Sequence, residues 1–286
     1  MSEHHHDHGF PAYPGTALDL ERLRSEFGDG DPTAAGGSGE LLDELHLPLV
    51  AEQTTLVEHQ WRHDIRRGAV RGFLLSGPPG VGKTTLARRL AYELVRRFPR
   101  AAGRDGVAAV VVDGSDLARS KYGETEKRIR ELFDAARHGF GLHGQRSVLI
   151  FDDIESILMA RGGDQAKEWH FSQDSVFFHA VDDLDTSRTA LVLTTNRPDL
   201  VDEAIRDRFL RYDIGYPSPD ALTSVALRRV RDQGLTPDDL AAIESGIGRA
   251  IADGKVRSLR DAEHFAVRQY VTRILGTAPL ARSGLG

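Results

Sequence analysis

The chain has 286 residues, no cysteine and a formal net charge of −6, with 37 basic and 43 acidic side chains. Its length suffices for a full α/β core and a smaller second domain, and the lack of cysteine excludes disulfides and thiolate metal sites. It has no apolar run near the roughly 20 residues that cross a bilayer and no signal-peptide core, and its arginines alternate with acids, which argues against sequence-independent DNA binding. We therefore expect a soluble cytoplasmic protein with no membrane partner.

Residues 1–40 are predicted to form a flexible N-terminal leader. They contain three histidines at 4–6, several prolines and the sequence Gly-Gly-Ser-Gly at 36–39, and only residues 18–27 have a helical pattern. The histidines could bind a metal, but a solvated polar tract is the more common explanation when no second ligand cluster is present. From residue 41 onwards the pattern is that of a globular domain.

The most informative stretch is a glycine-rich turn that follows a strand-like run at 73–76 and leads into a helical pattern at 84–98. Its residues are Gly77, Pro78, Pro79, Gly80, Val81, Gly82, Lys83, Thr84 and Thr85. Glycines let backbone N–H groups converge on nucleotide phosphates, Lys83 supplies a positive charge, and the Thr84 hydroxyl can ligate Mg²⁺. The N-terminus of the following helix also favours a bound anion. The stretch therefore predicts a nucleotide phosphate site.

Short apolar runs alternate with helical or loop segments along the first three quarters of the chain. The five runs are 73–76, 107–112, 148–151, 190–194 and 211–214. This alternation predicts an α/β fold with a five-stranded parallel sheet, in a nucleotide-binding domain over 41–216. Three helices follow, two of them with clear starts at Thr236 and Ser258, so residues 217–286 are predicted to form a small helical lid with a C-terminal tail.

Two carboxylates, Asp152 and Asp153, follow directly after the third apolar run. They should lie at the carboxyl edge of the sheet, where open α/β sheets bind ligands. We expect Asp152 to position Mg²⁺ through water and Asp153 to act as the general base on the attacking water. Two adjacent acids are otherwise a common solvated turn, but the preceding phosphate loop favours the functional interpretation.

Arg260 is expected in the first turn of the last lid helix, next to Asp261. The helix dipole disfavours a cation there, so an arginine in this position suggests a bound anion. The alternative is an ordinary ion pair between Arg260 and a neighbouring acid.

Together these motifs resemble the AAA+ ATPase family over roughly residues 45–275, and the resemblance implies ATP with Mg²⁺ as the ligand. The stretch 193–198, Leu-Thr-Thr-Asn-Arg-Pro, resembles the sensor 1 strand, with Asn196 facing the γ-phosphate or the attacking water. Its alternative role is a turn-forming residue. Ser258-Leu259-Arg260 resembles the sensor 2 motif, whose arginine contacts the γ-phosphate.

Residues 201–209 resemble the family segment that carries arginine fingers, which reach the ATP of a neighbouring subunit. Arg208 is the finger that the resemblance indicates, with Arg206 as the second choice, and an ordinary surface pair with Asp207 is the alternative. A finger supplied in trans makes hydrolysis depend on assembly, so the resemblance implies a homo-oligomeric ring, usually a hexamer. The family has Glu where this chain has Asp153, which predicts slow hydrolysis unless the backbone compensates.

The segment 113–127 resembles the pore loop with which AAA+ remodelers grip their substrates. Tyr122 is the candidate gripping residue, with Lys121 beside it, and Trp169 is a candidate for a second pore contact. The usual pattern has one more residue between the aromatic and the glycine. A Tyr122 ring packed onto its own domain is the alternative.

Within the family, the chain resembles the pachytene-checkpoint remodelers of HORMA-domain proteins, and its size resembles bacterial members associated with CBASS antiphage defence. The shared features are Ile-Glu-Ser-Ile at 154–157, Asp207 with Arg208, and the stretch 212–218. We therefore expect an ATPase ring that pulls on a protein substrate, with a HORMA-domain protein as partner and nucleic acid not expected. Two alternatives stay open, a DNA-handling AAA+ protein and an ATP-gated assembly module with negligible hydrolysis.

Overall fold

A computed structural model of the chain describes residues 15–19, 23–24, 27, 40–99, 106–118, 124–141, 146–158, 175–201 and 203–275. The chain divides into two compact units. The first consists of Met1–Gly37, Pro48–Gly77 and Lys83–Asp213, and the second of Ser38–Leu47, Pro78–Gly82 and Ile214–Gly286. The domain limits at residues 40 and 216 stay a prediction.

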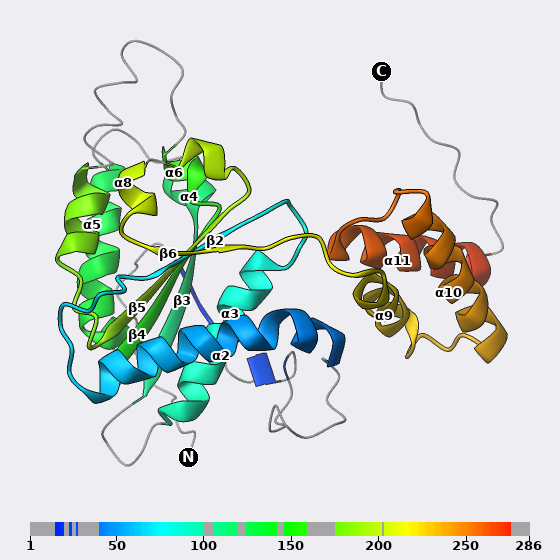
Figure 1. Cartoon of the computed structure of the whole chain (residues 1–286), viewed down its shortest axis with the longest axis horizontal. Coiled ribbons are helices and arrows are strands. Elements are labelled where there is room, and N and C mark those ends of the chain that lie inside the picture. Colours follow the sequence, from blue (N-terminus) through cyan, green and yellow to red (C-terminus); the bar gives the residue numbers. More distant parts are fainter. Residues whose placement is uncertain are drawn as a thin grey trace, which may run out of the picture. The chain divides into compact units, whose positions relative to one another are not determined.

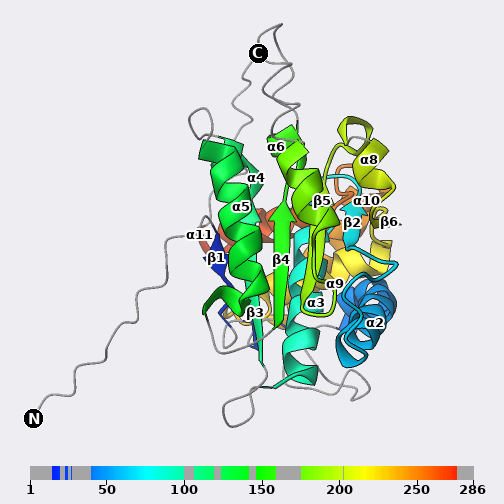
Figure 2. The same cartoon turned by 90° about the vertical axis from the view of Figure 1, so that its left-hand side faces the viewer.

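The first unit is built on a sheet of six strands in the order β1-β3-β4-β5-β2-β6 (Figures 1 and 2). The strands are β1 (Thr16–Ala17), β2 (Phe73–Ser76), β3 (Val107–Asp113), β4 (Arg146–Asp152), β5 (Thr189–Thr195) and β6 (Leu210–Asp213). Strands β2 to β6 run parallel, as the alternating apolar runs predict, and β1 pairs antiparallel with β3. The predicted α/β fold is confirmed, with a mixed sheet rather than a purely parallel one.

The expected count of five strands is corrected to six by β1, which arises within the stretch assigned to a flexible leader. Thr16 and Ala17 pair with Val111 and Val110 on the outer side of β3, and the Leu18 amide donates to the Ala109 carbonyl at 2.8 Å. An edge strand exposes a row of backbone groups that another segment can satisfy. Two residues show no side-chain alternation, so no sequence pattern reveals such a strand.

Helices flank the sheet on both faces. The helical elements of this part of the chain are α2 (Glu40–Arg62), α3 (Lys83–Arg97), α4 (Gly114–Ala118), α5 (Glu124–Arg137), α6 (Glu155–Leu158), α8 (Glu203–Arg206) and helical residues 175–182, with 3₁₀ turns η1 (Gly139–Gly141) and η2 (Pro198–Leu200). Figure 2 shows α5 on the near side of the sheet and α3 behind it. Strands β4 and β5 are buried almost throughout, as expected of parallel strands covered on both faces.

Three aromatic rings fix the strand that leads to the paired acids. Phe151 of β4 lies 6.0 Å from Phe133 of α5 and 5.4 Å from Phe177, measured between ring centroids, and all three side chains are buried. Large buried rings strongly restrain the element that carries them. The end of β4, and with it Asp152, is thereby held at a defined position at the carboxyl edge of the sheet.

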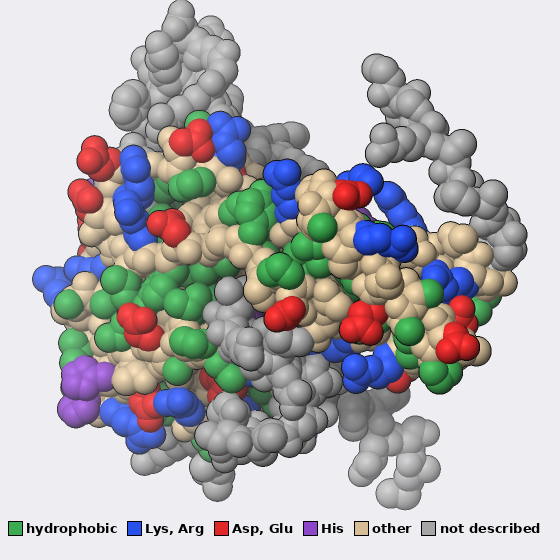
Figure 3. Space-filling model, turned by 45° about the vertical axis from the view of Figure 1, so that its right-hand side comes forward, with side chains coloured by type: hydrophobic (Ala, Val, Ile, Leu, Met, Phe, Trp, Pro, Cys, Tyr) green, Lys and Arg blue, Asp and Glu red, His purple; other side chains and the backbone are tan. Residues whose placement is uncertain are grey.

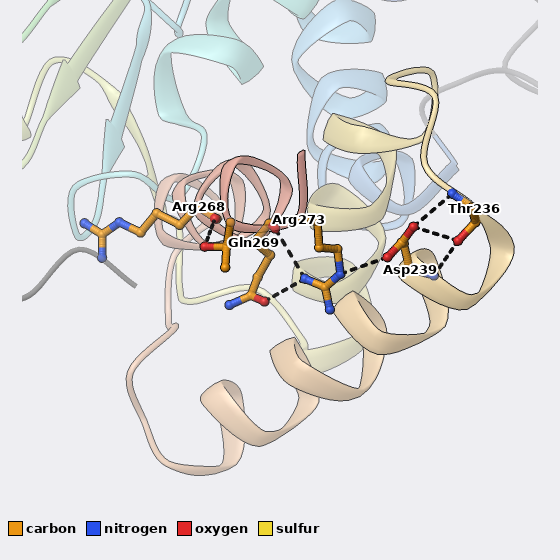
Figure 4. Close-up of polar contacts among 6 residues, drawn as sticks. Thr236, Asp239, Arg268, Gln269 and Arg273 are labelled. Carbon is orange, nitrogen blue, oxygen red and sulfur yellow. Dashed lines mark hydrogen bonds and ion pairs between the residues drawn. The ribbon is translucent and has the colours of Figure 1, made fainter. Parts of the chain in front are cut away.

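The second unit contains the three lid helices, α9 (Pro219–Val230), α10 (Pro237–Ala252) and α11 (Leu259–Leu275). Both predicted helix starts are confirmed. Thr236 and Asp239 form a reciprocal capping box at α10, and Ser258 accepts a hydrogen bond from the Asp261 amide while Asp261 accepts one from the Ser258 amide. Asp239 also pairs with Arg273 of α11 at 3.3 Å, which ties the start of α10 to α11 (Figure 4).

Candidate functional site

The glycine-rich turn connects β2 to α3, as the sequence predicts. Gly80 and Gly82 have φ angles of 77° and 98°, a region that L side chains rarely adopt. Val81 between them is fully buried, which anchors the turn. The first turn of α3 contains no acidic residue, so its N-terminal N–H groups stay suited to an anion.

Lys83 is the first residue of α3, and the residue is only 5% exposed. Its Nζ donates to the Gly77 carbonyl at 2.9 Å and to Asn196 Oδ1 at 2.7 Å. A buried ammonium group has to be hydrogen-bonded, and these bonds hold it beside the carboxyl end of β5, which Asn196 follows. Lys83 and Asn196, which lie 113 positions apart in the sequence, therefore belong to one site.

Asp152 ends β4 and receives two hydroxyl groups. Its Oδ1 accepts hydrogen bonds from Thr84 at 2.8 Å and from Thr194 at 2.5 Å. Hydroxyl and carboxylate oxygens are the ligands that Mg²⁺ prefers, and Mg²⁺ usually takes one or two protein groups and completes its shell with waters and phosphate. The described residues contain no group of three or more His, Cys, Asp or Glu side chains suited to a metal. The pair of Thr84 and Asp152 thus fits Mg²⁺ held together with a nucleotide.

Asp153 has a left-handed backbone, with φ of 51°, and its Oδ1 accepts a hydrogen bond from Asn196 Nδ2 at 2.6 Å. Burial raises the pKa of Asp153 above its ordinary value of 3.8, and the carboxylates of Asp152 and Glu155 raise it further. A strained backbone and a raised carboxyl pKa are features that gather at functional sites. The geometry suits a base that takes a proton more readily than an exposed aspartate.

Two side chains of the site were not singled out by the sequence patterns. Thr194 is fully buried, and besides its bond to Asp152 its Oγ1 accepts the Asp153 amide at 3.1 Å. Glu155 is 7% exposed, and its Oε1 accepts a hydrogen bond from the Asn196 backbone N–H at 2.9 Å. A polar side chain at the end of an otherwise apolar strand is the signal that could have revealed Thr194 in β5, whereas Glu155 begins α6 and has no such signal.

Arg208, the predicted finger, has a different set of contacts from the residues above. Its Nε and Nη2 donate to Asp182 at 2.8 and 3.0 Å, and its guanidinium carbon lies 5.2 Å from the Phe178 ring centroid. The alternative of a pair with its neighbour Asp207 is thus replaced by a pair with Asp182. Arg206, the second choice, ends α8.

Arg260 lies in the first turn of α11, and its backbone amide is 3.4 Å from the Gly80 carbonyl. A Cβ added to Gly80 would come within 3.0 Å of Arg260 Cβ and 2.9 Å of Ser258 Oγ. Within the second unit, the glycine-rich turn therefore packs closely on the start of α11. Among the residues that the structure describes, the Arg260 side chain makes no ion pair, so the alternative of an ion pair with a neighbouring acid is not found there.

The predicted pore residues Lys121, Tyr122 and Trp169 lie outside the described residues. Their roles stay predictions.

A phosphate turn between a strand and a helix, with acids after another parallel strand of the same sheet, defines the class of P-loop nucleotide-binding proteins. The sequence profile of the "ATPase family associated with various cellular activities (AAA)" matches residues 73–215, which is half of the chain. The chain belongs to this family of ATPases.

Individual relatives agree with this assignment. The "Proteasome-associated ATPase" of Acidimicrobium ferrooxidans is 32% identical over 202 residues, covering 70% of this chain and 33% of that protein. An "AAA ATPase forming ring-shaped complexes" of Kocuria rhizophila is 31% identical over 242 residues, covering 82% and 40%. The chain therefore spans between a third and two fifths of the length of these curated relatives.

Solved structures show the same fold. A crystal structure of the FIGL-1 AAA domain matches with a TM-score of 0.58 and 25% identity, covering 80% of this chain and 70% of that one. The FIGL-1 AAA domain in complex with ADP matches with a TM-score of 0.57 and 24% identity, covering 90% and 81%.

Proposed function

We propose that the chain binds ATP with Mg²⁺ and hydrolyses it in a ring of identical subunits, usually a hexamer in this family, to pull on a folded protein. The main support for the hydrolysis step is that the Asn196 carboxamide hydrogen-bonds both the Lys83 ammonium and the Asp153 carboxylate. A cation for phosphate, an amide and a carboxylate base then meet at one point of the sheet edge.

The residues would divide the work as follows. Lys83 and the turn bind the phosphates, Thr84 and Asp152 hold Mg²⁺, which neutralises developing charge, and Asp153 accepts the proton of the attacking water. The raised pKa of Asp153 makes it a stronger base than an exposed aspartate. Arg208 of a neighbouring copy supplies positive charge to the transferring phosphoryl group.

Ring formation is supported by the Kocuria rhizophila relative, whose name describes ring-shaped complexes. For the substrate we propose a HORMA-domain protein of a bacterial CBASS defence system in the cytoplasm, because of the sequence resemblance at 154–157, 207–208 and 212–218. None of the described helices is long and apolar enough to cross a membrane.

An ATP-gated module with negligible turnover is the second candidate, favoured by the short side chain of Asp153. A DNA-handling role is less well supported, because basic and acidic side chains are interspersed on the face drawn in Figure 3. DNA-stimulated ATPase activity would support that role.

The test is disassembly of a complex between a genomically neighbouring HORMA-domain protein and its partner, followed by size-exclusion chromatography with ATP. We expect wild type and Tyr122→Phe to release the partner, because both keep an aromatic ring, and Tyr122→Ala to hydrolyse ATP without releasing it. Equal release by Tyr122→Ala would remove Tyr122 from the pore. No release by wild type, together with strong DNA stimulation of hydrolysis, would favour the DNA-handling role.

A further inference from the structure

The Arg208 guanidinium is held by one side of the helical segment 175–182. Asp182 accepts two hydrogen bonds from it, at 2.8 and 3.0 Å, and Phe178, one turn earlier, presents its ring at 5.2 Å. Residues four apart lie on the same face of a helix, so the acid and the ring form one receptor for a guanidinium.

This receptor belongs to a fixed part of the fold. Phe177 and Val181 of the same segment are fully buried in the core. Arg71 Nη1 donates to the Asp182 carbonyl at 3.1 Å. The hydrogen bond from Arg208 lowers the pKa of Asp182 below its ordinary value of 3.8, so the carboxylate is ionised at neutral pH.

The side chains of the pair are partly exposed, 32% for Arg208 and 45% for Asp182. Asp182 occupies the Nε and Nη2 edge of the guanidinium, which is a fork that also suits a phosphate group. A carboxylate and a phosphate cannot both take this edge. Any anion that binds Arg208 in this manner must displace Asp182.

We infer that Asp182 is a positioning residue that restrains Arg208 within its own subunit and competes with the nucleotide phosphate of the neighbouring copy for it. The inference rests on the proposed function, in which Arg208 acts in trans. Breaking the Asp182–Arg208 pair is then part of the cost of building an active interface. Assembly with bound ATP and the release of Arg208 from Asp182 become coupled events.

The experiment measures ATP hydrolysis against protein concentration, at saturating MgATP, for wild type, Asp182→Asn and Asp182→Glu. Asp183→Asn is the matched control, because it removes the same charge one residue away and its side chain makes no hydrogen bond or ion pair among the described residues. Asp182→Asn should reach half-maximal rate at about two- to fivefold lower protein concentration, which is the worth of a partly exposed ion pair. Asp182→Glu and the control should match wild type.

The dependence of this concentration on salt is a second measurement, and a purely structural role of Asp182 would not change it. Raising ionic strength from about 0.05 to about 0.5 M screens the pair, so the ratio between wild type and Asp182→Asn should shrink toward one. Thermal unfolding of both Asn variants should stay close to that of wild type.

Three outcomes would overturn the inference. The first is that Asp182→Asn and Asp183→Asn reach half-maximal rate at the same protein concentration. The second is that the difference in this concentration between wild type and Asp182→Asn does not depend on salt. The third is a lower maximal rate of Asp182→Asn, which would mean that Asp182 presents Arg208 to the nucleotide instead of restraining it. An Arg208→Ala arm separates this failure from failure of the proposed function. If Arg208→Ala hydrolyses ATP like wild type, the trans role itself is wrong; if it is inactive while Asp182→Asn is unchanged, only the restraint is wrong.

Discussion

Replacing Thr194 with valine tests whether its hydroxyl organises the acidic end of β4. Thr194 is fully buried, and valine has nearly the same shape. The change removes the hydrogen bond to Asp152 Oδ1 and leaves the Asp153 amide without its acceptor. Packing is preserved, so the effect reports on the polar contacts.

The magnitude follows from these two contacts. A hydrogen bond to a charged acceptor contributes about 1.5–3 kcal/mol, and a buried N–H left unpaired costs about 1–3 kcal/mol. Because the two losses share one hydroxyl, we expect a combined loss of about 2–4 kcal/mol in the free energy of unfolding. This corresponds to a drop of roughly 5–12 °C in the melting temperature of the first unit.

The Mg²⁺ dependence of ATP hydrolysis should also change, because Thr194 orients the Asp152 carboxylate. Groups that orient a metal ligand typically contribute 10- to 100-fold to metal affinity, so the Mg²⁺ concentration for half-maximal hydrolysis should rise about tenfold or more in Thr194→Val. The assay titrates Mg²⁺ at constant ATP and records phosphate release, and urea unfolding without nucleotide gives the stability. The affinity for ATP, measured without hydrolysis, should change less than the Mg²⁺ requirement.

Thr195→Val is the matched control. Thr195 is also fully buried, but among the described residues its Oγ1 accepts a hydrogen bond only from the Arg197 backbone amide, at 3.0 Å. We expect a loss of about 1–2 kcal/mol in stability and an unchanged Mg²⁺ requirement. Equal Mg²⁺ requirements in the two variants would show that Thr194 does not position a metal-binding carboxylate.

Asp153→Asn should still bind ATP in a nucleotide-binding assay but should no longer release phosphate, whereas Asp153→Glu should hydrolyse ATP faster than wild type. Unchanged turnover in Asp153→Asn would show that the base is another group. Because the folded state raises the Asp153 pKa, protonation removes the base as pH falls through that raised value. The acid limb of kcat/KM, which reports the free enzyme, should therefore lie above pH 3.8, and a limb at 3.8 or below would contradict this assignment. By the same linkage, ionised Asp153 destabilises the fold above its raised pKa, so Asp153→Asn should melt higher than wild type at neutral pH. Gly80→Ala should destabilise the second unit by about 1–2 kcal/mol, because the φ angle of Gly80 is 77° and Ser258 lies close to it. Gly248→Ala, at an open position in a helix, should instead stabilise the second unit by about 0.5–1 kcal/mol. Equal shifts in melting temperature for the two variants would contradict this prediction.

The sequence carried the parts of the site that are contiguous or end a strand. The turn at 77–85 and the acids at 152–153 follow local patterns, and chain connectivity alone places them at the carboxyl edge. Asn196 could be found in the same way, because it follows β5 directly. These predictions need only the direction of each strand.

The remaining contacts depend on which elements become neighbours in space. Thr194 meets Asp152 because β5 pairs with β4, and Arg208 meets Asp182 across 26 positions. No local periodicity encodes such partners. The strand β1 is too short to show any pattern, and it pairs because β3 has an open edge.

If one ATP site is completed by two copies of the chain, mixing two inactive variants should restore hydrolysis. Lys83→Ala removes the phosphate cation and keeps Arg208, whereas Arg208→Ala does the reverse. In an equimolar mixture that co-assembles randomly, about a quarter of the interfaces join an intact Lys83 to an intact Arg208. We therefore expect phosphate release to recover to about a quarter of the wild-type rate. A rate equal to the sum of the two separate variants, in rings that contain both, would mean that the site is not shared between copies.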